Sequence, residues 1–231
     1  NVNLDVRCRE VIGMAGMEGS GQDLLLKVCA GLIRPVEGKI LLSGKDRTGV
    51  SYLGFKRNGV AYMPASRLEE GLISGLTISE HGMLSDDPKG VFIDWESAQS
   101  SAQKRIEDFS IRGVPSTKVE ALSGGNQQRT LLALLREPLN LLLLEHPTRG
   151  LDIESTIYIW KRLKERCNHG TSILFISPDL EEILQYSDRI LVFFSGRVSP
   201  FIDASHTNVD QLGQLIGGKG WSEVFQGQEI S

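Results

Sequence analysis

The sequence predicts an α/β protein built on a parallel, doubly wound sheet. Residues 141–144 are apolar throughout, and residues 172–176 are apolar after Ser172, which is typical of strands that a parallel sheet buries on both faces. Helical patterns alternate with such runs along the chain, as they do in doubly wound folds. A glycine-rich turn joins an early strand to the first helix, and this order of strand, glycines and helix is the context of a phosphate-binding loop.

The expected strands are short segments rich in apolar residues and bounded by glycine or polar residues. The first two precede the glycine-rich turn, and the next two flank a polar, glycine-containing stretch at residues 43–58. In order, the expected strands span residues 3–7, 11–15, 39–42, 60–63, 141–144, 172–176 and 190–194.

The expected helices are recognised by apolar residues at helical spacing and by the residues that end them. Gly31 and Pro35 end the first helix, and Pro138 prevents the third from continuing. The fourth has apolar residues at positions 153, 157, 160 and 163 and ends before Gly170. In order, the expected helices span about residues 24–32, 96–109, 122–135, 153–167 and 180–184.

Strand patterns fade between residues 71 and 116, where a polar helix is flanked by glycines and prolines. This change in character predicts a helical insertion into an α/β core. We expect a single domain with a core at 1–70 and 134–200, a helical subdomain at 71–133 and a C-terminal extension at 201–231. The end of the extension, after Gly217, is glycine-rich and polar, so we expect it to be frayed.

The composition is that of a soluble globular protein, with 40% hydrophobic and 23% charged residues among 231. The net charge of −4 argues against a nucleic-acid partner. Apolar runs are far shorter than the roughly 20 residues that span a bilayer, and residues 1–10 do not resemble a signal peptide. Three widely spaced cysteines favour free thiols in a reducing compartment.

Residues 16–23 read Gly-Met-Glu-Gly-Ser-Gly-Gln-Asp and have the glycine spacing of a Walker A loop, G-x-x-x-x-G-K-[ST]. In such a loop backbone N–H groups cradle phosphates, a lysine neutralises them and a hydroxyl binds Mg²⁺. Gln22 stands at the lysine position and Asp23 at the hydroxyl position. A tight strand-to-helix turn explains the glycines equally well. The candidate nucleotide ligands here are Gly16, Gly19, Ser20, Gly21, Gln22 and Asp23.

Residues 122–129 read Leu-Ser-Gly-Gly-Asn-Gln-Gln-Arg and resemble the signature motif of ABC ATPases, with an ending similar to that of sugar importers. A serine and two glycines at a helix N-terminus form an anion site from free N–H groups and the helix dipole. The alternative is an ordinary serine N-cap. The resemblance implies that the motif reaches the γ-phosphate of ATP on a partner's Walker A loop. The candidate residues are Leu122, Ser123, Gly124, Gly125, Asn126 and Gln127.

Three further segments support the same family. Residues 141–152 resemble the Walker B strand and D-loop, hhhhDEPTxGLD, which adds Asp152 as a nucleotide-site candidate. Residues 63–72 resemble the PEDRKREGL segment in the second ATPase half of tandem ribose- and galactose-type importers, although Ala65 departs from its glutamate. Residues 187–191 resemble SDRIxV at the last core strand. The resemblance implies a P-loop NTPase (RecA-like) core with an ABC-type helical subdomain, and the C-terminal half of a tandem protein.

The departures from the family pattern remove positive charge from the chain's own site. ATP hydrolysis depends on electrostatic stabilisation of the phosphates and on a positioned water. Gln22 supplies no cation, while Glu18 and Asp23 add anions to the loop. Glu145 replaces the Walker B aspartate and is one methylene longer. We therefore expect any Mg²⁺ site at Asp23 and Glu145 to be weak or lost.

Two further positions lack the family's catalytic residues. His146 stands where the resemblance places the catalytic glutamate; an imidazole can act as a base near pH 7, but we expect a non-catalytic substitution. Pro178 stands at the switch-histidine position and has no side-chain donor for a γ-phosphate. Arg67 is the one cation expected to be able to replace the missing lysine, and we interpret it as a solvated loop arginine.

These observations predict one half of an ABC importer for a sugar or related solute, located on the cytoplasmic face of the membrane. Its signature would complete the ATP–Mg²⁺ site of an N-terminal half or second subunit, its own site would be inactive or very weak, and its helical region would act on permease subunits. One alternative is a non-transport ABC ATPase, for which the chain lacks a coiled-coil insertion and a basic surface. Another is a scaffold or regulatory domain that has lost nucleotide.

Overall fold

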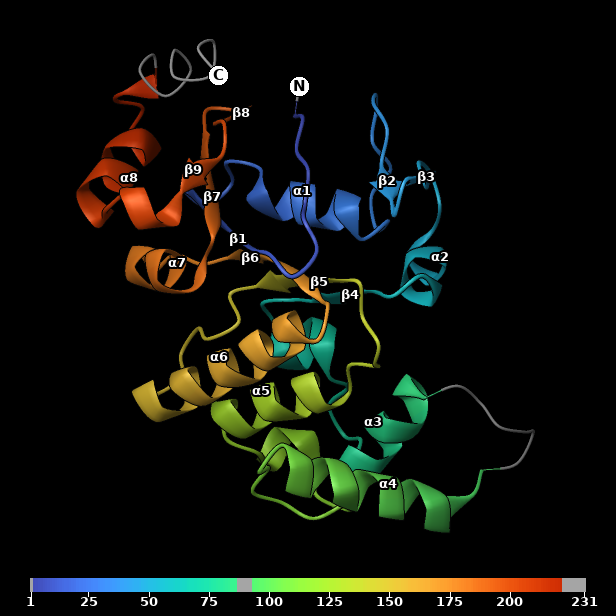
Figure 1. Cartoon of the computed structure of the whole chain (residues 1–231). Coiled ribbons are helices and arrows are strands. Elements are labelled where there is room, and N and C mark those ends of the chain that lie inside the picture. Colours follow the sequence, from blue (N-terminus) through green and yellow to red (C-terminus); the bar gives the residue numbers. More distant parts are fainter. Residues whose placement is uncertain (1, 87–92, 222–231) are drawn as a thin grey trace. The chain divides into compact units, whose positions relative to one another are not determined.

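The computed structural model describes residues 2–86 and 93–221, which form two compact units (Figure 1). The first unit comprises Asn1–Tyr62, Leu139–His146 and Leu163–Ser231, and the second comprises Met63–Pro138 and Pro147–Arg162. The subdomain boundaries expected at 71, 133 and 201 stay predictions. Much of the tail expected to fray, residues 222–231, lies outside the described residues. None of the helices in the described parts is both long and apolar enough to cross a membrane.

A mixed sheet forms the centre of the first unit. Four neighbouring strands, β5, β6, β1 and β7, are parallel, which confirms the predicted α/β class. Strands β8 and β9 are antiparallel to β7, and β4 lies beside β5 at the other edge. In spatial order the strands are β4 (Val60–Met63), β5 (Leu141–Glu145), β6 (Ser172–Ile176), β1 (Val11–Gly16), β7 (Arg189–Phe194) and β8 (Arg197–Val198), with β9 (Ile202–Asp203) also on β7.

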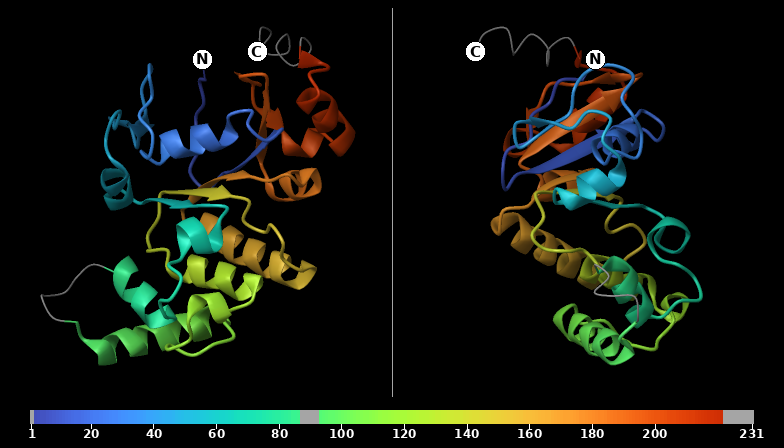
Figure 2. Two further views of the ribbon diagram at one scale, coloured as in Figure 1. Left: turned by 180° about the vertical axis from the view of Figure 1, so that it is seen from behind. Right: turned by 90° about the vertical axis from the view of Figure 1, so that its right-hand side faces the viewer.

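Helices pack on both faces of this sheet, as a doubly wound fold requires. Helix α1 (Gln22–Cys29) packs on β1, β5 and β6 (Figure 2). Its Leu26 is completely buried. Helix α7 (Leu180–Tyr186) packs on β1 next to Gly13, where a Cβ atom would lie 2.8 Å from Cγ2 of Ile183. Successive residues of a strand face opposite sides. Leu26 of α1 shares a cluster with Ile12 and Met14, on either side of Gly13, so the two helices cover different faces of β1.

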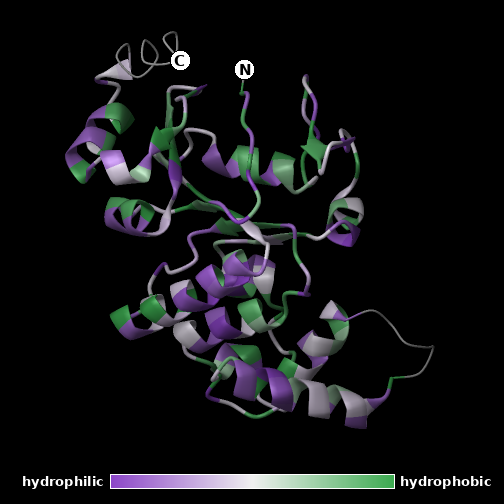
Figure 3. Ribbon diagram, in the orientation of Figure 1, coloured by the Kyte–Doolittle hydropathy of each residue, from purple (hydrophilic) through white to green (hydrophobic). Residues whose placement is uncertain are grey.

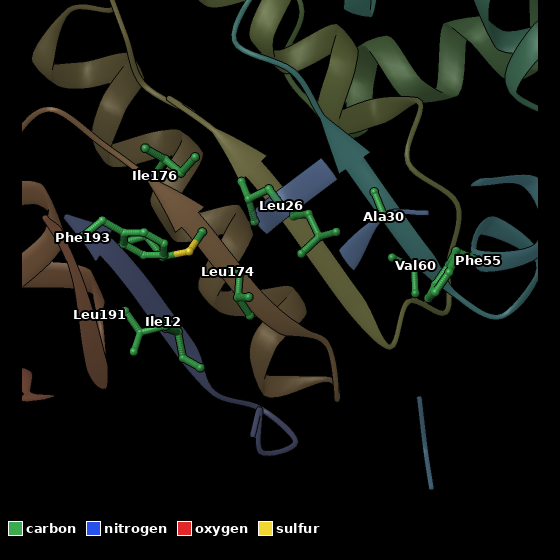
Figure 4. Close-up of a cluster of buried hydrophobic side chains, with 11 residues drawn as sticks. Ile12, Leu26, Ala30, Phe55, Val60, Leu174, Ile176, Leu191 and Phe193 are labelled. Carbon is green, nitrogen blue, oxygen red and sulfur yellow. The ribbon is translucent and has the colours of Figure 1, made fainter. Parts of the chain in front are cut away.

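The core of the first unit is formed by α1, α2 (Tyr52–Arg57) and the central strands, and Figure 4 shows Leu26, Leu174 and Phe193 among its side chains. Its strands are largely hydrophobic, whereas α4 (Trp95–Asp108) in the second unit carries mostly hydrophilic residues (Figure 3). Smaller elements of the first unit are β2 (Leu41–Leu42), β3 (Lys45–Asp46), a 3₁₀ turn (Ala204–His206) and α8 (Val209–Ile216).

The second unit is helical. A capping box begins α3, because the Thr77 hydroxyl accepts from the Glu80 N–H while the Glu80 carboxylate accepts from the Thr77 N–H. A small apolar core includes Ile78, Ile106 and Leu122. The elements are a π-helical turn (Arg67–Gly71), α3 (Ile78–Ser85), α4 (Trp95–Asp108), a 3₁₀ turn (Val119–Ala121), α5 (Gly124–Ala133) and the first part of α6 (Ile153–Asn168).

One prediction about local structure is wrong. Residues 3–7 form no strand, because side chains bind their backbone: the Ser172 hydroxyl donates to the Arg7 carbonyl, and Arg189 donates to the Asp5 carbonyl. Of the apolar residues noted on α6, Ile153 and Ile157 are 80% and 58% exposed. The strand expected at 39–42 is reduced to β2, and α2 and α8 form in segments where the sequence predicts no helix. Helix α3 lies in the predicted helical insertion, at residues where no individual helix is expected.

Candidate functional site

The glycine-rich loop of the first unit connects the end of β1 to the start of α1. Gly19 and Gly21 have φ angles of 79° and 108°, a left-handed conformation that favours glycine. The Ser20 N–H donates to the Met17 carbonyl at 3.0 Å and closes the turn. Gly21 is the N-cap of α1 and offers no side-chain capping bond. The predicted strand–loop–helix arrangement is therefore present, with backbone N–H groups at a helix N-terminus.

Gln22 lies inside this loop. Its side chain is buried, and its Nε2 donates to the Met17 carbonyl at 3.3 Å. It also lies against Gly16, where an added Cβ atom would be 3.0 Å from Cδ of Gln22. Asp23 and Glu18 are exposed, and Asp23 lies in the first turn of α1. The loop thus keeps its shape through a neutral amide, and its charged side chains are anionic.

Glu145 ends β5 and is engaged by two residues that the sequence analysis missed. The buried Glu145 carboxylate accepts a hydrogen bond from Oη of Tyr62 at 2.7 Å through Oε1. The same oxygen lies 3.9 Å from Nζ of Lys27. Helical side chains point toward the N-terminus of their helix, so Lys27 on α1 extends toward the end where the loop lies. Only their positions in the sequence hint at this contact: Tyr62 lies in β4, the strand beside β5, and Lys27 follows Gln22 on the same helix.

These contacts fit a magnesium ion poorly. Mg²⁺ requires near-octahedral oxygen ligands. A cation on Oε1 of Glu145 would lie beside the Lys27 ammonium, and two unit charges at about 4 Å repel by about 4 kcal/mol at an effective dielectric of about 20. Within the described ranges, no group of three or more His, Cys, Asp or Glu residues is arranged to hold a metal ion. Asp23 and Glu145 are thus a poor donor set for this ion.

His146 and Pro178 lie in the turns that follow β5 and β6. The His146 N–H donates to the Ile176 carbonyl at 2.9 Å, and His146 has a φ angle of 48°, in the left-handed region. Next to Pro178, the Ser177 hydroxyl donates to the buried Glu182 carboxylate and accepts from the Asp179 N–H. These contacts position the two turns, and the expected loss of catalytic function at His146 and Pro178 stays a prediction.

The signature segment of the second unit begins α5. Ser123 occupies the N-cap position, but among the described residues its side chain makes no capping bond; it accepts instead from Nδ2 of Asn126 at 2.8 Å. Ser123 is thus at the N-cap, as the alternative had it, but without the side-chain bond of an ordinary serine cap. Gln127 is buried and its Nε2 donates to the carbonyls of Val119 and Leu122 at 3.2 and 3.1 Å. Asn126 and Gln127 thus hold the loop before α5, and the Ser123 side chain does not cover the helix terminus.

Arg67 is not a solvated loop arginine, and that interpretation is wrong. Its Nε donates to Oε1 of Gln128 at 2.9 Å, and its Nη2 donates to the Arg149 carbonyl. Burial and then the nearby Arg149 charge lower the pKa of Arg67, although a guanidinium stays protonated in proteins. A Cβ atom on Gly124 would lie 3.0 Å from Nη1 of Arg67. The guanidinium therefore lies directly beside the first residue of α5.

Asp152, the last residue of the D-loop segment, directly precedes α6 and bonds to Ser155, which lies near the signature. Its carboxylate accepts from the Ser155 N–H at 2.8 Å and from the Ser155 hydroxyl at 3.0 Å, and these bonds lower the pKa of Asp152. An added Cβ atom on Gly125 would lie 2.8 Å from Oγ of Ser155. The second unit thus brings together Gly125, Ser155 and Asp152. The first unit brings together Gln22 and the glycines of the loop.

A cavity of about 930 Å³ opens beside the glycine-rich loop in the first unit. Its lining includes Ser20 and Gly21 of the loop, Leu24 and Val28 of α1, and Ile40. This volume falls within the range of sites for small-molecule ligands.

Comparison with known proteins identifies the family. The model of the ABC transporter family matches residues 1–149. This chain belongs to the ABC transporter family. It is 36% identical over 94% of its length to the "Nucleoside import ATP-binding protein NupA" of Lactococcus lactis subsp. cremoris, and 33% identical over 100% of its length to the "Glucose import ATP-binding protein TsgD13" of Haloferax volcanii. The chain spans 44% of each of these two relatives.

Solved structures show the same fold. A nucleotide-free ATP-binding cassette from an ABC transporter superposes with a TM-score of 0.75 at 18% identity, covering 96% of this chain and 90% of that one. The cassette MJ0796 in a dimeric post-hydrolysis state bound to ADP and Pi gives 0.74 at 23% identity, covering 88% and 89%. The chain therefore has the fold of an ABC ATPase, with a P-loop NTPase core and a parallel sheet.

Proposed function

We propose that this ABC domain supplies its signature to the ATP site of a second ABC domain in an importer, and that its own site hydrolyses ATP weakly or not at all. The observation that carries the proposal is a contrast within one chain. The signature, residues 122–127, is complete and begins a well-held helix. The phosphate loop has the neutral Gln22 folded inside it.

The signature is suited to bind a phosphate of ATP on a partner domain. Because the Ser123 side chain does not cap α5, the backbone N–H groups at Gly124 and Gly125 face the end of the helix with its positive dipole. Arg67 lies against Gly124 and adds a cation beside this terminus. Ser155 of α6, whose hydroxyl donates to Asp152, lies close to Gly125 of the same turn.

The chain's own site keeps features of nucleotide binding but loses those of hydrolysis. The loop of Gly16, Gly19, Ser20 and Gly21 and the neighbouring cavity leave room for a nucleotide. At the positions that should supply a lysine, a metal-binding hydroxyl, a metal-binding aspartate, a base and a switch histidine, the chain has Gln22, Asp23, Glu145, His146 and Pro178. Enzymes catalyse phosphoryl transfer mainly by electrostatic stabilisation of the transition state. These substitutions remove most of that stabilisation.

The transported class is a sugar or nucleoside-like solute. Similar proteins carry names for the import of nucleosides, glucose and arabinose. The chain spans less than half of their length, which fits a longer protein with a second ABC domain. The resemblance of residues 63–72 to the second half of tandem importers is the reason for proposing the C-terminal half. Such a protein would act with transmembrane permease subunits on the cytoplasmic face of the membrane, and the net charge of −4 gives no support for a nucleic-acid partner.

Mixing this chain with the complementary ABC half of its transporter tests the proposal. We expect background ATP turnover by the chain alone and clear turnover by the mixture. Ser123→Arg should abolish that turnover, because the larger cation would fill the start of α5. Ser100→Arg, the same change at an exposed position of α4, is the matched control and should have no effect. Turnover by the isolated chain equal to that of the mixture would refute the proposal.

A further inference from the structure

The Glu145 carboxylate already lies close to a cation of the chain itself, the Lys27 ammonium. Lys27 and Tyr62 both approach one oxygen of Glu145, the ammonium at 3.9 Å and the phenol at 2.7 Å. The Glu145 side chain is 8% exposed, whereas that of Lys27 is 31% exposed. A buried carboxylate requires a charge partner or hydrogen bonds. In the first unit Lys27 supplies the charge partner and Tyr62 supplies the hydrogen bond.

This carboxylate lies at the end of the sheet where the phosphate loop also lies. Glu145 is the last residue of β5, Gly16 is the last residue of β1, and both strands are parallel to β6 between them. Ligands of open α/β sheets bind at the carboxyl ends of the strands. The Lys27 ammonium therefore occupies the neighbourhood in which a divalent cation would meet the phosphates.

The charges near the loop also favour Lys27 as the cation that meets the phosphates. Gln22 is neutral, and Asp23 is exposed in the first turn of α1. An ammonium has three donors, so Lys27 can keep its contact with Glu145 and still donate to a phosphate oxygen. Being partly exposed, it can reach a bound anion without leaving its helix.

We infer that Lys27 replaces the divalent cation in this chain's own site, so that the site takes a nucleotide without Mg²⁺. The inference rests on the proposed function, in which this site retains a loop that can hold phosphates but has lost hydrolysis. It assigns Lys27 as a phosphate-binding residue and Tyr62 as the residue that positions Glu145.

Two binding measurements on the whole chain test the inference. The first is the Kd for ATP by calorimetry in excess MgCl₂ and in excess EDTA. We expect the wild type to differ by less than about twofold between the two, and Lys27→Met to lose about tenfold in EDTA. Lys27→Arg, which keeps the charge, should behave like the wild type. Lys45→Met, the same truncation at an exposed lysine of β3, is the matched control.

The second measurement uses Mn²⁺ added to the ATP-bound chain and detected by electron paramagnetic resonance. Lys27→Met should gain Mn²⁺ binding that the wild type and Lys45→Met lack, because removal of the ammonium lets a cation lie between Glu145 and the phosphate oxygens. The double variant Lys27→Met/Glu145→Gln should lose that binding again.

A wild-type affinity for ATP that rises about tenfold with Mg²⁺ overturns the inference, as does a wild-type chain that binds no ATP in either condition. Neither result affects the proposed function, which is decided by turnover of the mixed halves and by Ser123→Arg. If the mixed halves show no turnover while the chain still binds ATP without Mg²⁺, the proposed function is refuted and the inference about Lys27 is not.

Discussion

At the scale of single residues, the shape of the phosphate loop and its chemistry depend on different side chains. Gly19 and Gly21 produce the turn, because their φ angles are in the left-handed region. Gln22 decides the charge, and its amide is buried against Gly16 and Met17. A substitution at Gln22 can therefore change affinity for phosphate while the turn remains.

Gln22→Lys should raise the affinity of the isolated chain for ATP by about tenfold, which is about 1.4 kcal/mol, because it places a cation inside the loop. Titration of ATP by calorimetry measures this gain. Gln99→Lys, at an exposed position of α4, adds the same charge far along the chain and serves as control. An equal gain in both variants would mean that net charge, and not the loop, is responsible.

Asp152 should contribute stability that depends on pH. The bonds from Ser155 lower its folded-state pKa below the ordinary value of 3.8. The contribution is therefore fully present above about pH 5 and is lost as the pH falls through the folded-state pKa. Asp152→Asn should lower the urea midpoint at pH 7, and the difference from wild type should shrink below about pH 4. A difference that is the same at pH 7 and pH 3 would contradict this assignment.

At the scale of elements, the start of α5 depends on close approach to α6. Ser155 is buried and leaves no room for a side chain at Gly125, where a Cβ atom would lie 2.8 Å from its hydroxyl. The exposed Ile153 and Ile157 are consistent with this rotation of α6, which places Ser155 toward the signature. The small residue in the signature thus has a packing reason as well as a phosphate-binding one.

Gly125→Ala should destabilise the chain by about 1–3 kcal/mol, because overpacking outweighs the roughly 1 kcal/mol that alanine adds to helix propensity. In a Ser155→Ala background the same substitution should be neutral or stabilising. Chemical unfolding of the four members of this cycle gives the coupling. Gly213→Ala in α8, where a Cβ atom meets nothing within 4 Å, should stabilise and is the control. Additive effects of Gly125→Ala and Ser155→Ala would disprove the contact.

At the scale of the whole molecule, the two units differ in the size of their cores. The cluster in the first unit includes the central strands β1, β5, β6 and β7, whereas that in the second is smaller and lies among helices and loops. Local opening is easier where fewer apolar side chains are buried.

Amide hydrogen exchange should therefore be slowest in β1 and β6 and faster in α3 and α4. We expect protection of the strand amides to follow the global free energy of unfolding, while α4 exchanges through smaller openings. Mass spectrometry of exchanged peptides resolves these segments. Equal protection of α4 and β6 would show that the two units open together.

The sequence by itself determined the class of the fold, the positions of β4 and β6, the glycine-rich turn and the membership in the ABC family. These depend on local patterns: apolar runs, left-handed glycines and motif spacing. Only the tertiary structure decided the surroundings of Glu145 and Arg67. Tyr62 and Lys27 meet Glu145, and Gln128 and Arg149 meet Arg67, from distant parts of the chain. Such contacts depend on the order of strands and the rotation of helices, which no local pattern encodes.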